Sequence, residues 1–305
     1  MSERKLEVYN ILNFLNSGYD LDYILKESNW VTFSSDDECI NYLVSEGYLL
    51  DESGEKENSV LTFDDLKEHT IPQLKDLLRE HNLKVSGKKH ELINRLLAVL
   101  NESKTQSLDD FAVSNDYKLT EKALKFLKDD QWIDLYTFAL INFRFEDYAT
   151  YVSNSSKDMI TTALNFCDEV ISRSLINNYF LLFLTALSAK AHVYAYDGDY
   201  ESFLDYDLQR FILGLNPIVL DAGAYANYVI IEPANVINIK NVSEKFNFGR
   251  LKNRFDKLWV KSNIKNVTVP KKTAFKYLKR AMGGANLDDL NFELREKYFN
   301  KKFGE

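Results

Sequence analysis

The chain has 305 residues, which corresponds to about two domains of ordinary size. Hydrophobic residues make up 45% of it and charged residues 28%, a balance that excludes global disorder, and the formal net charge is −8. With only 11 glycines, 4 prolines and 2 cysteines, the composition predicts a mainly α-helical protein and excludes a disulfide-stapled secreted domain.

No stretch of the sequence predicts a membrane helix or a secretion signal. The most apolar segment, residues 179–189, is much shorter than the ~20 residues that a membrane span needs. The first residues, MSERKLEVYN, lack the apolar core of a signal peptide. Together with the two cysteines, Cys39 and Cys167, these features predict a cytoplasmic protein in a reducing compartment, without a membrane partner.

The distribution of apolar and polar residues divides the chain into five segments. Apolar residues at helical spacing predict an N-terminal helical unit. Polar stretches without large apolar residues predict two linkers. In chain order the segments are the helical unit at 1–50, a linker at 51–60, a compact helical module at 61–100, a linker at 101–112 and a helical C-terminal domain at 113–305. Within the last domain, the β-branched residues of 228–240 predict one short strand.

The strongest local pattern lies in residues 70–97, TIPQLKDLLREHNLKVSGKKHELINRLL. Thr70 is a suitable N-cap and Pro72 suits a first helical turn, while leucines at helical spacing give this helix an apolar face. Asn82 suits a left-handed residue at the helix end, and Ser86 caps a second helix with its own apolar stripe. Because two such short helices are marginal alone, the loop between them must hold them together.

This pattern closely resembles the SAP domain, a helix–extended loop–helix module that binds nucleic acid. The family pattern places an apolar–Lys pair in the first helix, then Gly-Leu, a short loop, Gly-x-Lys, and Leu-x-x-Arg-Leu in the second helix. The matching residues are Leu74-Lys75, Asn82-Leu83, Gly87-Lys88-Lys89 and Leu92-Ile93-Asn94-Arg95-Leu96. Asn82 in place of Gly is the one departure. The resemblance covers residues 62–100, and similar units occur in bacterial and phage proteins of unassigned role.

The resemblance implies a nucleic-acid partner, with double-stranded DNA expected, and the charges of the module agree with it. Ser86 and Gly87 open a helix whose N–H groups and dipole favour a phosphate, and three lysines surround the same helix end. The expected contact residues are Lys75, Arg79, Lys84, Ser86, Gly87, Lys88, Lys89 and Arg95. The alternatives are a purely structural helical hairpin and a protein-docking element.

The net charge hides a strong asymmetry along the chain. Residues 1–239 hold 39 acidic against 21 basic residues, whereas residues 240–305 hold 7 against 17. Two helices are expected there, each with an apolar stripe beside a cationic face, and such faces suit a polyanion. The predicted contact residues are Arg250, Arg254, Lys257, Lys261, Lys272, Lys276 and Lys279. A solvated lysine-rich surface, a pair of membrane-surface helices and docking against the acidic part of the chain are the alternatives.

No motif for catalysis, a metal or a cofactor is found. The sequence lacks a phosphate-binding loop, a dinucleotide fingerprint and the G-x-S-x-G and H-E-x-x-H patterns. His192 is expected to pack in the core, and the acidic residues of 197–207 lack the ordered spacing of metal ligands. Asp221, Glu232 and Lys240 have the wrong spacing for a nuclease core of two acids and a lysine.

We therefore expect a non-enzymatic nucleic-acid-binding protein that uses both the SAP-like module and the basic C-terminal helices. Its richness in Asn, Lys, Ile, Tyr and Phe agrees with a bacterial or phage origin. Two alternatives stay open: a protein-interaction scaffold in which the SAP fold is a docking element, and a DNA-processing enzyme with an unrecognised active site in the C-terminal domain.

Overall fold

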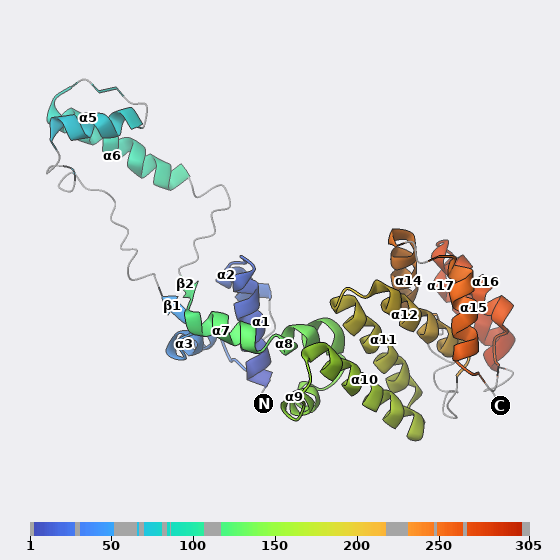
Figure 1. Ribbon diagram of the computed structural model, residues 1–305. Helices are drawn as coiled ribbons and strands as arrows, with labels where there is room; N and C mark the ends of the chain where they lie inside the picture. Colours follow the sequence, from blue (N-terminus) through green and yellow to red (C-terminus); the bar gives the residue numbers. More distant parts are fainter. Residues whose placement is uncertain are drawn as a thin grey trace. The chain divides into compact units, whose positions relative to one another are not determined.

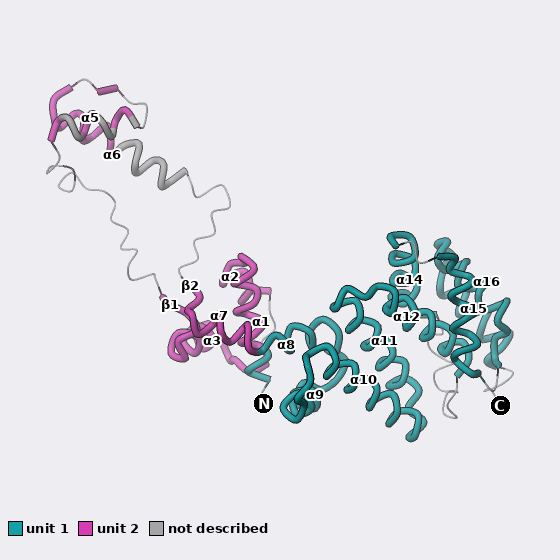
Figure 2. The backbone as a smooth tube through the Cα atoms, viewed as in Figure 1, with its two compact units in different colours: residues 1–6, 130–305 teal, residues 7–129 magenta. Residues whose placement is uncertain are grey.

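The computed structural model describes residues 3–27, 31–51, 66, 70–80, 84–85, 87–106, 117–217, 231–246, 249–264 and 267–300. These residues are mainly helical, with one short pair of strands among them, so the predicted mainly α fold is confirmed (Figure 1). They form two compact units, Glu7–Asp129 and Met1–Leu6 with Asp130–Glu305 (Figure 2). Within the described ranges, no helix is long and apolar enough to cross a membrane.

Besides those of the SAP-like module, the described residues of the smaller unit form four helices. They are α1 (Glu3–Asn16), whose first residues belong to the larger unit, α2 (Leu21–Glu27), α3 (Asp36–Ser45) and α7 (Glu121–Asp129). Ser35 caps α3: its side chain accepts a hydrogen bond from the Glu38 amide at 3.2 Å, and the Glu38 carboxylate accepts one from the Ser34 amide at 2.8 Å. This reciprocal arrangement satisfies amides that a helix start would otherwise leave unpaired.

A two-stranded antiparallel sheet joins the chain before the SAP-like module to the chain after it. Strand β1 (Leu49–Asp51) pairs with β2 (Tyr117–Leu119), so that Leu49 lies opposite Leu119. Directly after β2, the Thr120 hydroxyl donates to the Gly47 carbonyl at 2.8 Å. The SAP-like module is therefore an insertion between two paired strands.

The structure places one domain boundary at a different position from the one that the sequence predicted. The ring of Phe126 on α7 contacts those of Tyr9 on α1 and Tyr48 before β1, with ring centroids 5.9 and 5.3 Å apart. Residues 117–129 consequently pack with the N-terminal helices. The division of the structure falls after Asp129, whereas the sequence predicted that the C-terminal domain begins at 113.

The described residues of the SAP-like module include two helices, α5 (Ile71–Glu80) and α6 (Lys89–Gln106). Its core contains the apolar stripes expected from the sequence, and the buried members are Leu66, Leu74, Leu78, Leu92, Ile93 and Leu96. Helix α6 continues to Gln106, so residues 101–106 of the predicted second linker are helical. The first linker after residue 51 and residues 107–112 of the second lie outside the described residues.

The larger unit is helical throughout its described residues. Its elements are α8 (Trp132–Leu135), the π-helix η1 (Tyr136–Leu140), α9 (Phe145–Ser153), α10 (Met159–Ile176), α11 (Phe180–Tyr196), α12 (Tyr200–Leu215), α14 (Pro233–Lys245), α15 (Leu251–Lys261), α16 (Lys271–Met282), α17 (Leu287–Leu294) and the π-helix η2 (Arg295–Phe299). Helices α10, α11 and α12 lie side by side, and a continuous core extends from α11 and α12 through α14 to α17 (Figure 1).

The strand predicted over residues 228–240 is wrong for the part that the structure describes. Helix α14 begins at Pro233, which occupies a first-turn position where its missing N–H is harmless. Val236, Ile239 and Val242 recur at helical spacing and are buried in the core of the larger unit. β-branched residues therefore serve here as the buried face of a helix, because packing overrides their preference for strands.

Candidate nucleic-acid interface

The cationic side chains of the two-helix module differ in how far they reach solvent. Lys84 and Lys88 are exposed in the loop and at the start of α6, and Arg79 is exposed on α5. Lys75 and Lys89 are half-buried. Predicted contact residue Ser86 lies outside the described residues.

Arg95 has a structural role in the module. It is half-buried on α6, and its Nη1 donates a hydrogen bond to the backbone carbonyl of Lys84 in the loop. The guanidinium thus ties the loop backbone to the second helix. Such a tie is what two short helices need to stay together.

The start of α6 is already occupied by a carboxylate of the same helix. Glu91 Oε2 accepts a hydrogen bond from the Lys88 amide at 2.8 Å, and the Lys88 carbonyl accepts one from the Leu92 amide at 3.1 Å. Lys88 is therefore the N-cap residue, and Glu91 closes a capping arrangement around it. The sequence predicted that a phosphate would bind this helix end, and in the structure the Lys88 amide at this end already donates to Glu91.

Gly87 makes that cap possible. Its φ is +142°, a conformation that residues with a Cβ rarely adopt, and a Cβ added there would lie 2.6 Å from Glu91 Oε2. The sequence predicted Gly87 as a nucleic-acid contact residue at this helix start. In this structure it leaves room for the capping carboxylate.

Comparison with protein families identifies the module. The family model of the SAP domain matches residues 65–101, the stretch that holds α5, the loop and the first part of α6. Residues 65–101 are a SAP domain. No curated protein and no solved structure matched the chain significantly. SAP domains are in general nucleic-acid-binding modules, so the match supports a DNA- or RNA-binding role for this chain.

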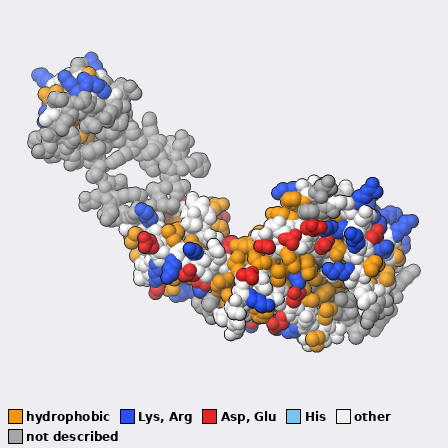
Figure 3. All heavy atoms as spheres, viewed as in Figure 1, with side chains coloured by type: hydrophobic (Ala, Val, Ile, Leu, Met, Phe, Trp, Pro, Cys, Tyr) orange, Lys and Arg blue, Asp and Glu red, His pale blue; other side chains and the backbone are white. Residues whose placement is uncertain are grey.

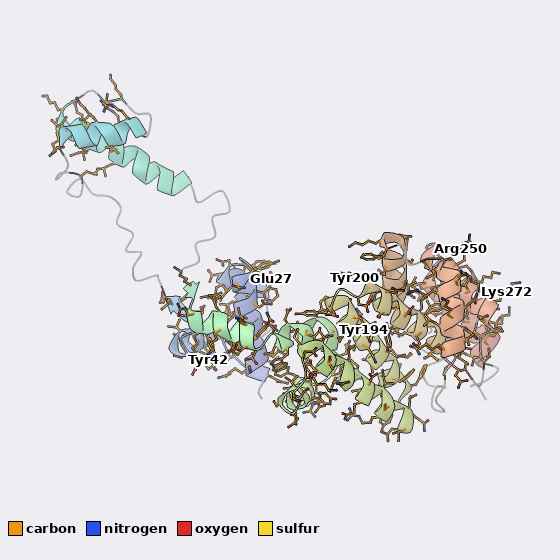
Figure 4. The ribbon with its side chains drawn as sticks, viewed as in Figure 1. Glu27, Tyr42, Tyr194, Tyr200, Arg250 and Lys272 are labelled. Atoms are coloured by element: carbon orange, nitrogen blue, oxygen red, sulfur yellow. The ribbon has the colours of Figure 1, made fainter. Side chains whose placement is uncertain are left out.

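Outside the SAP domain, the predicted cations gather on α15 and α16. Leu251, Phe255 and Leu258 of α15 face the core of the larger unit, and Leu278 of α16 does the same. The opposite sides carry the lysines, and blue side chains gather over this end of the larger unit (Figure 3). Six predicted cations are exposed there: Arg250, Lys257, Lys261, Lys272, Lys276 and Lys279. Arg250 and Lys272 mark the starts of the two helices (Figure 4).

Arg254 does not belong to that exposed set. Its side chain is only 15% exposed, and its guanidinium pairs with Glu201 and, at 2.9 Å, with Asp205 Oδ1. Both carboxylates lie on α12, so this pairing joins α12 to α15 inside the larger unit. Arg254 was predicted to contact nucleic acid, but the structure gives it a structural role. The negative charges of the two carboxylates offset the positive charge of the guanidinium, and its hydrogen-bond donors are directed at them.

Several other basic residues of this region are also paired within the unit. Asp256 accepts the ammonium groups of Lys252 and, at 3.4 Å, Lys271, and these contacts hold the pKa of Asp256 below its usual range. Arg280 forms two hydrogen bonds with Glu293, at 2.6 and 2.9 Å, and lowers the pKa of that carboxyl to about 2. The basic composition of residues 240–280 therefore overstates the charge available on the surface.

The acidic residues of 197–207 play separate structural parts. Asp199 caps α12 by accepting the Ser202 amide at 3.0 Å, and Asp205 belongs to the Arg254 pairing. Asp207 is fully buried; it accepts the Asn235 side-chain amide at 3.1 Å, and burial raises the pKa of its carboxyl to about 6. Among the described residues, no group of three or more potential ligands could hold a metal ion.

Sequence reasoning missed the buried Asp207, although a signal for it was present. Asp207 lies three residues after Leu204 and four before Phe211, which places it on the apolar stripe of α12. An acid at a core position of a helix predicts a buried, hydrogen-bonded carboxyl. No pattern around Arg254 in the sequence indicates its ion pairs, because its partners come from a different helix.

The remaining candidates for chemistry are packed or paired. His192 is half-buried between the rings of Phe138 and Phe203, and its Nδ1 lies 2.8 Å from the Ser188 carbonyl. Cys167 is fully buried, which raises the pKa of its thiol to about 12. Glu232 forms an ion pair with Arg210, and Asp221 lies outside the described residues, so the nuclease-like set is not assembled among those described.

Proposed function

We propose that this protein binds nucleic acid, specifically double-stranded DNA, through its SAP domain and through the exposed cations of α15 and α16. The observation that carries the proposal is the SAP domain itself, with Lys84 exposed in its loop and Lys88 exposed at the start of α6. In this proposal the protein acts in the cytoplasm and catalyses no reaction. Because Glu91 occupies the Lys88 amide, the side chains of the lysines, rather than the helix end, contact the phosphates.

The exposed cations of α15 and α16 support a second contact region. One SAP domain offers few cations, and nonspecific binding with so few contacts is weak, with dissociation constants of ~10⁻⁴–10⁻⁶ M at physiological salt. A second cationic surface on the same chain raises the overall affinity by ~10²–10⁴ when both regions engage one duplex. The second surface consists of the six exposed residues given above, without Arg254.

A salt titration tests the contribution of the SAP domain. Replacing Lys88 and Lys89 by Ala should lower the affinity for duplexes of any sequence and reduce the slope of log K against log salt by about 1.8, because each phosphate contact contributes about 0.9. Lys125 and Lys128, two exposed lysines of α7, provide the matched control. Unchanged affinity and slope in a folded Lys88/Lys89 variant would contradict the proposal.

Charge reversal tests the second surface. Changing Lys257, Lys261 and Lys272 to Glu should weaken duplex binding while leaving the melting temperature unchanged, because these side chains are exposed. A lower melting temperature with full affinity would instead show that this surface docks within the protein. Metal-dependent nicking of plasmid DNA by the purified chain would favour the alternative of a DNA-processing enzyme.

A further inference from the structure

A charged pocket lies between α12 and α15 in the larger unit. It has a volume of about 470 Å³, which falls in the range of small-ligand sites. Its walls carry four cations, Arg250, Arg254, Lys257 and Lys261, all from one side of α15 at successive helical turns, and two carboxylates, Glu201 and Asp205, from α12. Its lining is thus mostly ionic.

The two sides of the pocket differ in how firmly they are fixed. Arg254 is held by Glu201 and Asp205, with a further contact of 3.3 Å from its Nη1 to the Glu201 carbonyl. Arg250, Lys257 and Lys261 are exposed, and the described residues contain no ion pair for any of the three. The lining therefore combines one fixed ion-pair cluster, which holds α12 against α15, with three exposed cations.

The charge balance of the lining indicates the kind of ligand. Four cations against two carboxylates leave a formal charge of +2. A phosphodiester inside a nucleic-acid strand carries one negative charge, whereas a phosphomonoester carries about −1.5 to −2 at pH 7. Lysine and arginine side chains are also the groups that bind phosphate oxygens with charge-assisted hydrogen bonds.

We propose that this pocket binds a phosphomonoester: the terminal phosphate of a nucleic-acid strand, or that of a free nucleotide. Arg250, Lys257 and Lys261 contact the phosphate oxygens, while Arg254 is a positioning residue that holds α12 against α15. The volume admits the terminal nucleotide along with its phosphate. The strand-end form of the proposal rests on the proposed nucleic-acid binding and adds a preference for phosphorylated ends.

The test compares two oligonucleotides that differ only in the phosphate. The full-length protein is titrated into a single strand labelled at its 3′ end and bearing either a 5′-phosphate or a 5′-hydroxyl, at one fixed salt concentration, and fluorescence anisotropy gives the affinity. We expect the phosphorylated strand to bind about tenfold more tightly, the size of one or two charge-assisted hydrogen bonds. Equal affinities for the two strands would overturn the proposal for strand ends.

Variants assign the preference to the pocket. Lys257→Gln with Lys261→Gln should remove the preference for the phosphate, whereas the control, Lys276→Gln with Lys279→Gln on α16, should lower both affinities and keep their ratio. All four lysines are exposed, so the melting temperatures should match that of the wild type. A preference that survives the Lys257/Lys261 change would place the phosphate elsewhere and overturn the assignment.

Calorimetry with a nucleoside 5′-monophosphate, and with the nucleoside as control, separates the two sources of the ligand. If the wild type binds the monophosphate but not the nucleoside, and the Lys257/Lys261 variant does not bind the monophosphate, the pocket is a nucleotide site. If the chain in addition binds no oligonucleotide, only the proposed nucleic-acid function is contradicted. Conversely, duplex binding without any preference for phosphorylated strands and without nucleotide binding would overturn the pocket and leave the proposed function intact.

Discussion

Replacing Arg254 by Met tests whether that residue holds α12 and α15 together. Removing one partner of a fully buried ion pair costs about 3–5 kcal/mol, whereas exposed pairs contribute about 0–1 kcal/mol. The Arg254 side chain is 15% exposed, but its partners Glu201 and Asp205 are 60% and 37% exposed, so solvent screens part of the interaction. We therefore expect Arg254→Met to lower the free energy of unfolding by an intermediate amount, about 2 kcal/mol. Methionine is chosen because it keeps most of the packing volume of the arginine side chain.

Differential scanning calorimetry of the full chain measures this loss. For a unit of this size, 1 kcal/mol corresponds to about 2–4 °C, so the melting transition of the larger unit should fall by about 4–8 °C. The matched control is Lys257→Met, one turn along α15, whose side chain is exposed and should leave the transition unchanged. The reasoning is refuted if both variants shift the transition equally, or if Arg254→Met leaves it in place.

The pH dependence of the same variant provides an independent check. Burial raises the pKa of Asp205, and Arg254 acts in the opposite direction by favouring its ionised form. Without Arg254, the carboxyl should keep its proton to a higher pH in the folded state than in the wild type. The destabilisation should consequently be larger at neutral pH than at a pH low enough to protonate Asp205 in both proteins.

Three further predictions concern other parts of the chain. Burial raises the pKa of Asp207 to about 6, above its unfolded value near 3.8, so wild-type stability should fall as the pH rises from about 4 to 6; Asp207→Asn should melt higher than wild type at pH 7.5, with no difference near pH 4. Gly87→Ala should displace Glu91 from the α6 cap and speed amide exchange in α6, at a cost of about 1–3 kcal/mol to the SAP domain, whereas unchanged exchange would contradict the cap geometry. Replacing residues 52–116 by a two-residue turn should leave the rest of the smaller unit folded, because β1 and β2 already pair as a hairpin would. Aggregation of this deletion variant would show that the insertion supports the fold.

The SAP domain could be found from the sequence because its determinants are local. Its two apolar stripes, the loop and the basic residues around Gly87 all lie within about 35 consecutive residues, and each has a direct effect on helix or turn formation. The strand pair β1–β2 could not be found in the same way. Leu49 and Leu119 are separated by the whole SAP domain, and three residues on each side are too few to show alternation.

The two helices predicted for the basic C-terminal region are present in the structure, but the sequence did not show which of their cations are paired. The spacing of Leu251, Phe255 and Leu258 fixes which side of α15 is buried, and a cationic face on the other side follows from it. The sequence does not say which helix packs beside that face. Only the structure shows that α12 brings Glu201 and Asp205 against Arg254, and that one predicted contact residue is therefore neutralised.

The pairing of basic side chains with carboxylates of the same unit limits how much this region can contribute to the salt dependence of nucleic-acid binding. Residues 240–280 hold 13 basic side chains, but Arg254, Lys252, Lys271 and Arg280 are paired with carboxylates of the same unit. If all six exposed cations of α15 and α16 contacted phosphates, they would contribute about 5 to the slope of log K against log salt. A measured contribution well above that value would require further cations, either Lys240, Lys245 and Lys265 of the same region or paired cations that leave their carboxylates on binding. In the second case Arg254→Met would lower the slope in addition to the melting temperature, whereas a cation that stays on Glu201 and Asp205 lowers the melting temperature alone.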